Sequence, residues 1–164
     1  MKDNQNELFP EVDEEGKVIG QMTRGEAHSG TKRLHPVVHL HLFNSKGELF
    51  LQRRPEWKDI QPGRWDTACG GHVDWGETVE EALQREVREE LGLEGVQMIS
   101  LGKYVFESDR ERELVYIHKA IYDGEVRTNR EELDGGRFFR MDEIAALKGK
   151  GFFTPNFESE FELL

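Results

Sequence analysis

The sequence lacks the features that mark secreted and membrane proteins. Its 164 residues include a single cysteine, so a disulfide framework is not supported. It has no run of 18 apolar residues and no N-terminal basic segment followed by an apolar one, so neither a membrane span nor a secretory signal is predicted. Internal repeats and low-complexity linkers are also absent, and the length suits one domain, taken as residues 1–164. We therefore expect a single cytoplasmic domain without a membrane partner.

Basic residues are scarce relative to acidic ones. The chain has 22 Lys and Arg against 33 Asp and Glu, for a formal net charge of −11. A surface of this charge repels polyanions, which argues against nucleic acid as a partner. A small phosphorylated ligand that binds together with a divalent cation remains compatible with it. The sequence leaves open whether the chain forms a homodimer.

The most informative segment combines a glycine-containing loop, Gly71–Glu77, with a well-marked helix. Thr78 is a favourable N-cap, Glu81 completes a capping box three residues later, and Gly92 stands where a helix ends. These signals predict a helix over Thr78–Leu91. Its apolar stripe indicates that one face packs against a core.

Two glutamates of this helix lie beside the apolar stripe. Glu86 and Glu90 have no basic residue three or four positions away, so neither is expected to have a basic partner on its own helix. Like charges beside a core are unfavourable, which predicts a compensating cation, and Mg²⁺ prefers carboxylates together with substrate phosphate. The alternative is a solvated acidic face in which Arg85 pairs with Glu81 and Glu89.

The spacing over residues 71–93 resembles the Nudix box at each defining position: Gly, five residues, Glu, seven residues, Arg-Glu-Val-Arg-Glu-Glu, then Leu-Gly-Leu. The resemblance implies that Mg²⁺ or Mn²⁺ is held by Glu86, Glu89, Glu90 and the main-chain carbonyl of Gly70. It also implies supporting roles for Glu77 and Arg85, with Arg85 steadying the loop and the glutamates.

Several segments upstream of the box resemble a branch of the same superfamily, the type I isopentenyl-diphosphate isomerases and their relatives. They are Glu26–His28, Arg33–His35, Phe43–Gly47, Leu51–Arg54 and Pro62–Trp65. This resemblance implies a second divalent metal, held by His28, His35, His72, Glu111 and Glu113. Imidazole and carboxylate ligands suit a transition metal or zinc. Taken singly, each of these residues is more often structural or on the surface.

Two departures argue against isomerase chemistry. Counted from Trp65, the catalytic cysteine position of the isomerases falls on Gly70, whereas Cys69 lies one place earlier. On a strand, that one-residue slip turns the side chain to the other face, and a free cysteine is commonly a small buried hydrophobe. The glutamate set is also complete, while the isomerases carry it in degenerate form. Both departures favour hydrolysis.

The sequence therefore predicts hydrolysis of a diphosphate linked to another moiety, such as a nucleoside diphosphate derivative, by water that a bound divalent metal makes more acidic. The proton acceptor is Glu86 or a glutamate of a later loop, Glu132 or its neighbour Glu131. Two alternatives stay open, an isopentenyl-diphosphate isomerase and a non-catalytic module that binds a phosphorylated effector.

A cationic group upstream of the box is a candidate for the substrate's outer phosphate. Its members are Arg53, Arg54, Lys58 and Arg64. They are equally well interpreted as solvated surface charges.

Hydrophobic periodicity predicts seven strands: Leu8–Val12, Val18–Met22, His35–Phe43, Glu48–Arg53, Met98–Phe106, Leu114–Tyr122 and Arg137–Arg140. It predicts three helices: Thr23–His28, Thr78–Leu91 and Met141–Leu147. Glu158–Leu164 is either a short helix or a tail. Strand pairs joined by turns, with helices between later strands, predict an α/β (α+β) fold with a mixed β-sheet sandwiched between helices, as in Nudix proteins.

Overall fold

The computed structural model describes residues 4–57, 61–128 and 135–164 of the chain. The chain divides into two compact units. The first unit contains the residues up to His39, Gly70–Glu86 and Ile99–His118. The second unit contains Leu40–Cys69, Val87–Met98 and Lys119–Leu164.

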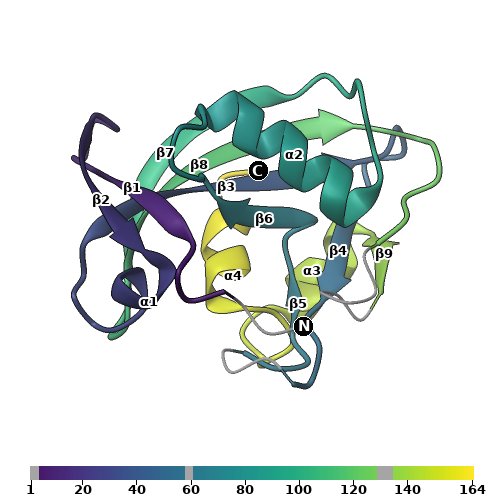
Figure 1. Ribbon diagram of the computed structural model, residues 1–164. Helices are drawn as coiled ribbons and strands as arrows, with labels where there is room; N and C mark the ends of the chain where they lie inside the picture. Colours follow the sequence, from purple (N-terminus) through teal and green to yellow (C-terminus); the bar gives the residue numbers. More distant parts are fainter. Residues whose placement is uncertain (1–3, 58–60, 129–134) are drawn as a thin grey trace. The chain divides into compact units, whose positions relative to one another are not determined.

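The strands of the described residues form two sheets. One has two strands, β1 and β2, and the other has seven, in the order β5-β4-β3-β8-β7 with β6 paired to β3 and β9 paired to β4. Helices α1 to α4 stand between and after these strands along the chain (Figure 1). The α+β class with a multi-stranded sheet, predicted from the sequence, is confirmed.

The first unit begins with a hairpin and a short helix. β1 (Leu8–Val12) and β2 (Val18–Thr23) pair antiparallel, and α1 (Arg24–Ala27) follows directly, beside the hairpin in Figure 1. Thr23 caps α1 through a capping box with Glu26. The hairpin and α1 bury a common apolar cluster of Phe9, Met22 and Ala27. We call this part of the chain, residues 8–27, the N-terminal hairpin.

The rest of the first unit is built mainly on three long strands and one short strand. They are β3 (Leu34–Phe43), β6 (Cys69–His72), β7 (Ile99–Glu107) and β8 (Arg112–Ile121), and β3 and β8 each continue into the second unit. Val37, Val115 and Ile117 form a buried cluster against which Tyr104 and Phe106 of β7 pack. The alternation of these side chains follows from the two-residue repeat of a strand.

The second unit has its core between strands and two short helices. Its elements are β4 (Leu49–Arg53), β5 (Trp65–Asp66), β9 (Gly136–Phe139), α3 (Met141–Leu147) and α4 (Pro155–Phe161). The core contains Leu49, Leu51, Phe139, Ile144, Phe153 and Phe157. Trp65 packs edge-on against Phe139 at 5.1 Å. α4 begins at Pro155, after the N-cap Thr154.

The structure extends the predicted set of elements. All seven predicted strands are present, with bounds that shift by at most two residues, and β5 and β6 are additional. The uncertain C-terminal segment contains a helix, α4, that begins three residues earlier than the predicted one. α2 (Val79–Leu91) follows its predicted cap. Within the described ranges, no helix is long and apolar enough to cross a membrane.

Candidate active site and metal centre

The box helix α2 is fixed at both ends by the groups that the sequence indicated. Thr78 Oγ1 accepts a hydrogen bond from the backbone N–H of Glu81 at 3.1 Å, and Glu81 Oε1 accepts one from the Thr78 N–H at 3.0 Å. Gly92 has a φ of +67°, and its N–H donates to the carbonyl of Arg88 at 3.1 Å, which is the αL type of helix end. The predicted capping of this helix is confirmed.

Arg85 ties the box loop to the box helix. Its Nε and Nη2 atoms donate to the two carboxylate oxygens of Glu77 at 2.7 and 2.9 Å. Its Nη1 donates to Glu86 Oε1 at 2.7 Å, and Nη2 also donates to the carbonyl of His72 at 3.0 Å. The expectation that Glu86 has no basic partner on its own helix is therefore wrong. Arg85 is its immediate neighbour, and the guanidinium bonds Glu86 and Glu77 at the same time.

The charges of this loop reinforce one another. The hydrogen bonds from Arg85 lower the pKa of Glu77, and the Glu77 carboxylate in turn raises the pKa of Arg85. Asp74 lies 3.4 Å from Arg85, yet burial, together with a hydrogen bond to Glu7, raises its pKa to about 6. The pair of Arg85 and Glu77 thus stays charged near neutral pH and anchors the loop.

Glycine at position 71 allows a close approach between β6 and Glu86. A Cβ atom at Gly71 would overlap the carboxyl group of Glu86, whereas a Cβ at Gly70 would lie 3.1 Å from the ring of His39. The Glu86 side chain is only 12% exposed. Its carboxylate is therefore held against the main chain, in a niche that any side chain would fill.

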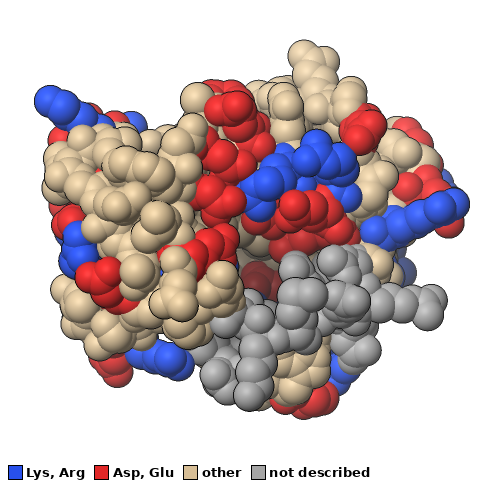
Figure 2. Space-filling view, in the orientation of Figure 1, with Lys and Arg blue, Asp and Glu red and all other residues tan. Residues whose placement is uncertain are grey.

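The other two box glutamates follow on the same helix. Glu89 and Glu90 stand three and four residues after Glu86, so all three share one side of α2. Glu90 is buried and accepts a long hydrogen bond, 3.4 Å, from Gln52 Nε2, while Glu89 is exposed. Figure 2 shows acidic side chains gathered around basic ones over α2. Oxygen donors in this number suit Mg²⁺ or Mn²⁺.

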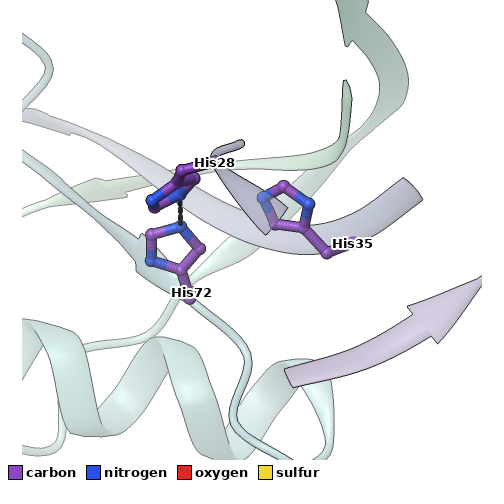
Figure 3. A group of neighbouring side chains, drawn as sticks. All are labelled: His28, His35 and His72. Carbon is purple, nitrogen blue, oxygen red and sulfur yellow. Dashed lines mark hydrogen bonds between the residues drawn. The ribbon is translucent and has the colours of Figure 1, made fainter. Parts of the chain in front are cut away.

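The five residues of the predicted second metal site come together in the first unit. His28 follows α1, His35 lies on β3 and His72 ends β6, and Figure 3 shows the three side chains close together, with ring nitrogens of His28 and His72 joined by a dashed line. His28 Nε2 is 3.3 Å from His72 Nε2 and 3.1 Å from Glu111 Oε2. His35 Nε2 is 3.9 Å from Glu111 Oε2 and 3.8 Å from Glu113 Oε2. These residues form two triads that share His35, and within each triad the donor atoms lie within 4.8 Å of one another. One triad is His28, His35 and His72, and the other is His35, Glu111 and Glu113.

One hydrogen bond of His35 fixes its tautomer. Its Nδ1 lies 3.2 Å from the carbonyl of Arg33, and because a carbonyl only accepts, Nδ1 carries the proton. In the neutral ring Nε2 then presents a bare lone pair. This atom is buried and has no hydrogen-bond partner in the described part of the chain, and it faces two carboxylates that also only accept. The lone pair of His35 Nε2 beside these carboxylate oxygens is an arrangement that could hold a cation.

The protonation states of this cluster also suit a metal. Burial lowers the pKa of His35, and it lowers that of His72 far more strongly. Burial opposes ionisation of Glu111, but its hydrogen bond with His28 contributes to a net lowering of its pKa. Neutral imidazoles beside ionised carboxylates are the forms that bind metal ions.

The predicted phosphate-binding arginines already have partners in the protein. Arg53 Nη2 donates to Glu56 Oε1 at 2.6 Å, and Arg64 Nη1 donates to the carbonyl of Phe153 at 3.5 Å. Arg54 Nη1 is 3.6 Å from Asp66 Oδ2. Three predicted site residues, Lys58, Glu131 and Glu132, lie outside the described residues. Contact of this group with substrate stays a prediction.

Cys69 is fully buried, as expected of a small core residue. Two residues gain importance only from the structure. Gln52 reaches Glu90 from β4, and Phe9 stacks on the ring of His72. No motif marks the last two. The alternation of apolar and polar residues along β1 indicates only that Phe9 is buried. In the segment that contains Gln52, the neighbouring arginines are the residues that suggest a function.

Comparisons with known proteins agree with this geometry. A family profile described as NUDIX domain matches residues 33–158. An uncharacterized Nudix hydrolase of Pseudomonas aeruginosa is 34% identical over 136 residues, covering 83% of this chain and 80% of the relative. Another, of Listeria monocytogenes, is 35% identical over 130 residues, covering 76% and 74%. The crystal structure of DR0079 from Deinococcus radiodurans matches with a TM-score of 0.81 at 27% identity, covering 95% of this chain and 98% of that one.

The fold and the capped, glutamate-rich box helix define the class as an α+β protein with a Nudix-type loop and helix. The chain belongs to the NUDIX domain family and is a Nudix hydrolase. Proteins of this family generally use divalent metals and act on small phosphorylated substrates. The predicted superfamily is thus confirmed, and the narrower resemblance to isomerases stays a prediction.

Proposed function

We propose that this protein hydrolyses a diphosphate linked to another moiety, with Mg²⁺ or Mn²⁺ held by Glu86, Glu89, Glu90 and the carbonyl of Gly70. The observation that carries the proposal is the Glu86 carboxylate, which lies against the glycine backbone of β6 and is held there by Arg85. A carboxylate fixed in this way is pre-organised for a cation, because little side-chain freedom is left to lose on binding.

Several residues of the protein have different roles around that site. A divalent metal bound there neutralises phosphate oxygens and makes water more acidic. Arg85 holds Glu86 and the box loop in place. Glu86 or Glu132 accepts the proton of the attacking water. The cationic group of Arg53, Arg54, Lys58 and Arg64 receives the outer phosphate, with the three described arginines exchanging a protein partner for a phosphate oxygen.

Substitution of Glu89 tests the hydrolytic proposal. Because Glu89 is exposed, Glu89→Gln should fold normally but lose a ligand charge, so phosphate release should fall by about a hundredfold or more. A screen of nucleoside diphosphate derivatives, dinucleotides, coenzyme A and prenyl diphosphates first identifies a substrate by released phosphate. Glu94→Gln, at an exposed glutamate after the same helix, is the matched control. Unchanged turnover at saturating Mg²⁺ would remove Glu89 from the ligand set.

We also propose that His28, His35, His72, Glu111 and Glu113 hold a second divalent metal, zinc or a transition metal. The support is the bare, buried Nε2 of His35, which faces two carboxylates and two further imidazoles. Cobalt reports on such a site, since Co²⁺ bound by imidazole and carboxylate absorbs visible light. Titration of the metal-free protein should give this band, and Zn²⁺ should displace it.

A pair of histidine variants makes this second test specific. His35→Gln should abolish the cobalt band, because the amide cannot reproduce the lone pair fixed by Arg33. His118→Gln changes another buried histidine, on β8, that is not in either triad, and should keep the band. A band of equal intensity in His35→Gln, or no band in the wild type, would contradict the second metal site.

The isomerase alternative receives less support. Cys69, the only thiol, is fully buried, and Gly70 supplies no acid at the position where the isomerases carry their cysteine. An assay for the allylic isomer of isopentenyl diphosphate, run beside the phosphate assay, separates the two reactions.

A further inference from the structure

An aromatic ring from the N-terminal hairpin lies flat against one of the proposed metal ligands. The ring of Phe9 is 4.5 Å from that of His72, centroid to centroid, and the two planes differ by only 7°. The ring of Phe9 is also 6.0 Å from that of His35 with planes 15° apart, and His35 and His72 are themselves stacked at 5.5 Å. Three rings thus lie nearly parallel.

Phe9 has little freedom of its own. It is fully buried, pairs with Met22 across the hairpin and packs against Ala27. The guanidinium of Arg24 lies 5.2 Å from the centroid of the Phe9 ring and is held by Glu7 at 2.9 Å. The cation attracts the face of the ring and adds to its immobility. Packing and charge therefore present a fixed flat surface to His72.

We infer that Phe9 is a positioning residue for the histidine metal centre, acting through His72. The lone pair of an imidazole nitrogen lies in the ring plane, so a metal bond requires the plane to point at the ion. The terminal torsion of a histidine side chain is broad, and without support the ring samples a wide range of planes. Stacking on Phe9 restricts that torsion and keeps His72 Nε2 directed at His28 and the other ligands. This inference rests on the proposed second metal.

The two histidines of the stack are oriented by different devices. His35 is held by a hydrogen bond from Nδ1 to the carbonyl of Arg33, the arrangement usual for metal-bound histidines. The ring of His72 is instead oriented by stacking on the flat face of Phe9. An aliphatic side chain of similar volume would fill the space but would present no plane against which the imidazole could align.

Cobalt affinity of two variants tests the inference. Phe9→Leu keeps an apolar side chain but removes the plane, so competition with a chelator should show about tenfold weaker Co²⁺ binding, as for other residues that orient metal ligands. Met22→Leu changes the cross-strand partner of Phe9 in the same buried cluster but keeps the aromatic ring, and should bind Co²⁺ within about twofold of the wild type. Thermal unfolding of both metal-free variants corrects for any unfolded fraction.

A second readout follows the ring itself. In the wild type the ring current of Phe9 shifts the imidazole proton resonances of His72, and Phe9→Leu should remove this shift whereas Met22→Leu should retain it. If Phe9→Leu does not fold, Phe9→Met is measured against the same control. Wild-type Co²⁺ affinity in the folded Phe9 variant would overturn the positioning role and leave the metal site intact. Absence of Co²⁺ binding in the wild type would instead refute the second metal and this inference together.

Discussion

Gly71 is the residue at which the backbone and the acidic site meet most closely. A methyl group there would overlap the carboxyl group of Glu86. Gly71→Ala should therefore push Glu86 out of its niche, weaken its hydrogen bond with Arg85 and lower phosphate release at least about tenfold. Overpacking of this kind also costs about 1–3 kcal/mol of unfolding free energy. Turnover and denaturant unfolding, measured on the same preparation, report both effects.

A second glycine in the first unit provides the comparison. A methyl group at Gly25, in α1, would meet Gln5 at 3.4 Å or more, which is ordinary contact. Gly25→Ala should thus leave turnover unchanged and keep or slightly raise stability, since alanine favours a helix. Equal turnover in Gly71→Ala and Gly25→Ala would show that the position of Glu86 does not depend on Gly71.

Among the elements, α2 could be predicted almost completely and β6 could not. The ends of α2 are set by local groups, Thr78 with Glu81 at its start and Gly92 at its end, and such signals are readable in sequence. β6 contains two consecutive glycines, which have low strand propensity. They are present because side chains would meet Glu86 and His39, residues far away in sequence. No local pattern indicates such contacts.

The site shows the same division between local and distant information. Spacing alone identified the box, and resemblance identified the histidines and glutamates that the structure brings together. The ion pair of Arg85 with Glu86 was missed because the rule of three or four residues does not consider residues that are adjacent in a helix. Phe9 was missed as well, since its contact with His72 joins residues more than sixty positions apart.

At the scale of the whole molecule, the two proposed metal sites differ in how they connect the chain. The second site draws its five ligands from three separate segments of the first unit, around His28 and His35, at His72, and at Glu111 and Glu113. The box site takes its side-chain ligands from a single helix, α2. A metal that joins distant segments suppresses local opening of all of them, whereas one held by a single helix protects mainly that helix.

Removal and replacement of metals should therefore give two distinct patterns of amide hydrogen exchange. Starting from the chelator-treated protein, Zn²⁺ should slow exchange in the N-terminal hairpin and around His72 and Glu111, because these segments can no longer open separately. At about a hundredfold excess over the dissociation constant the added protection corresponds to about 2.7 kcal/mol. Mg²⁺ should instead slow exchange in α2 and in the loop fixed by Arg85. His35→Gln should lose the Zn²⁺ pattern and keep the Mg²⁺ pattern, and Glu89→Gln should do the reverse. If both ions protected the same segments, or if either variant lost both patterns, the two sites would not be independent, and the assignment of separate ligand sets to α2 and to the histidine cluster would have to be abandoned.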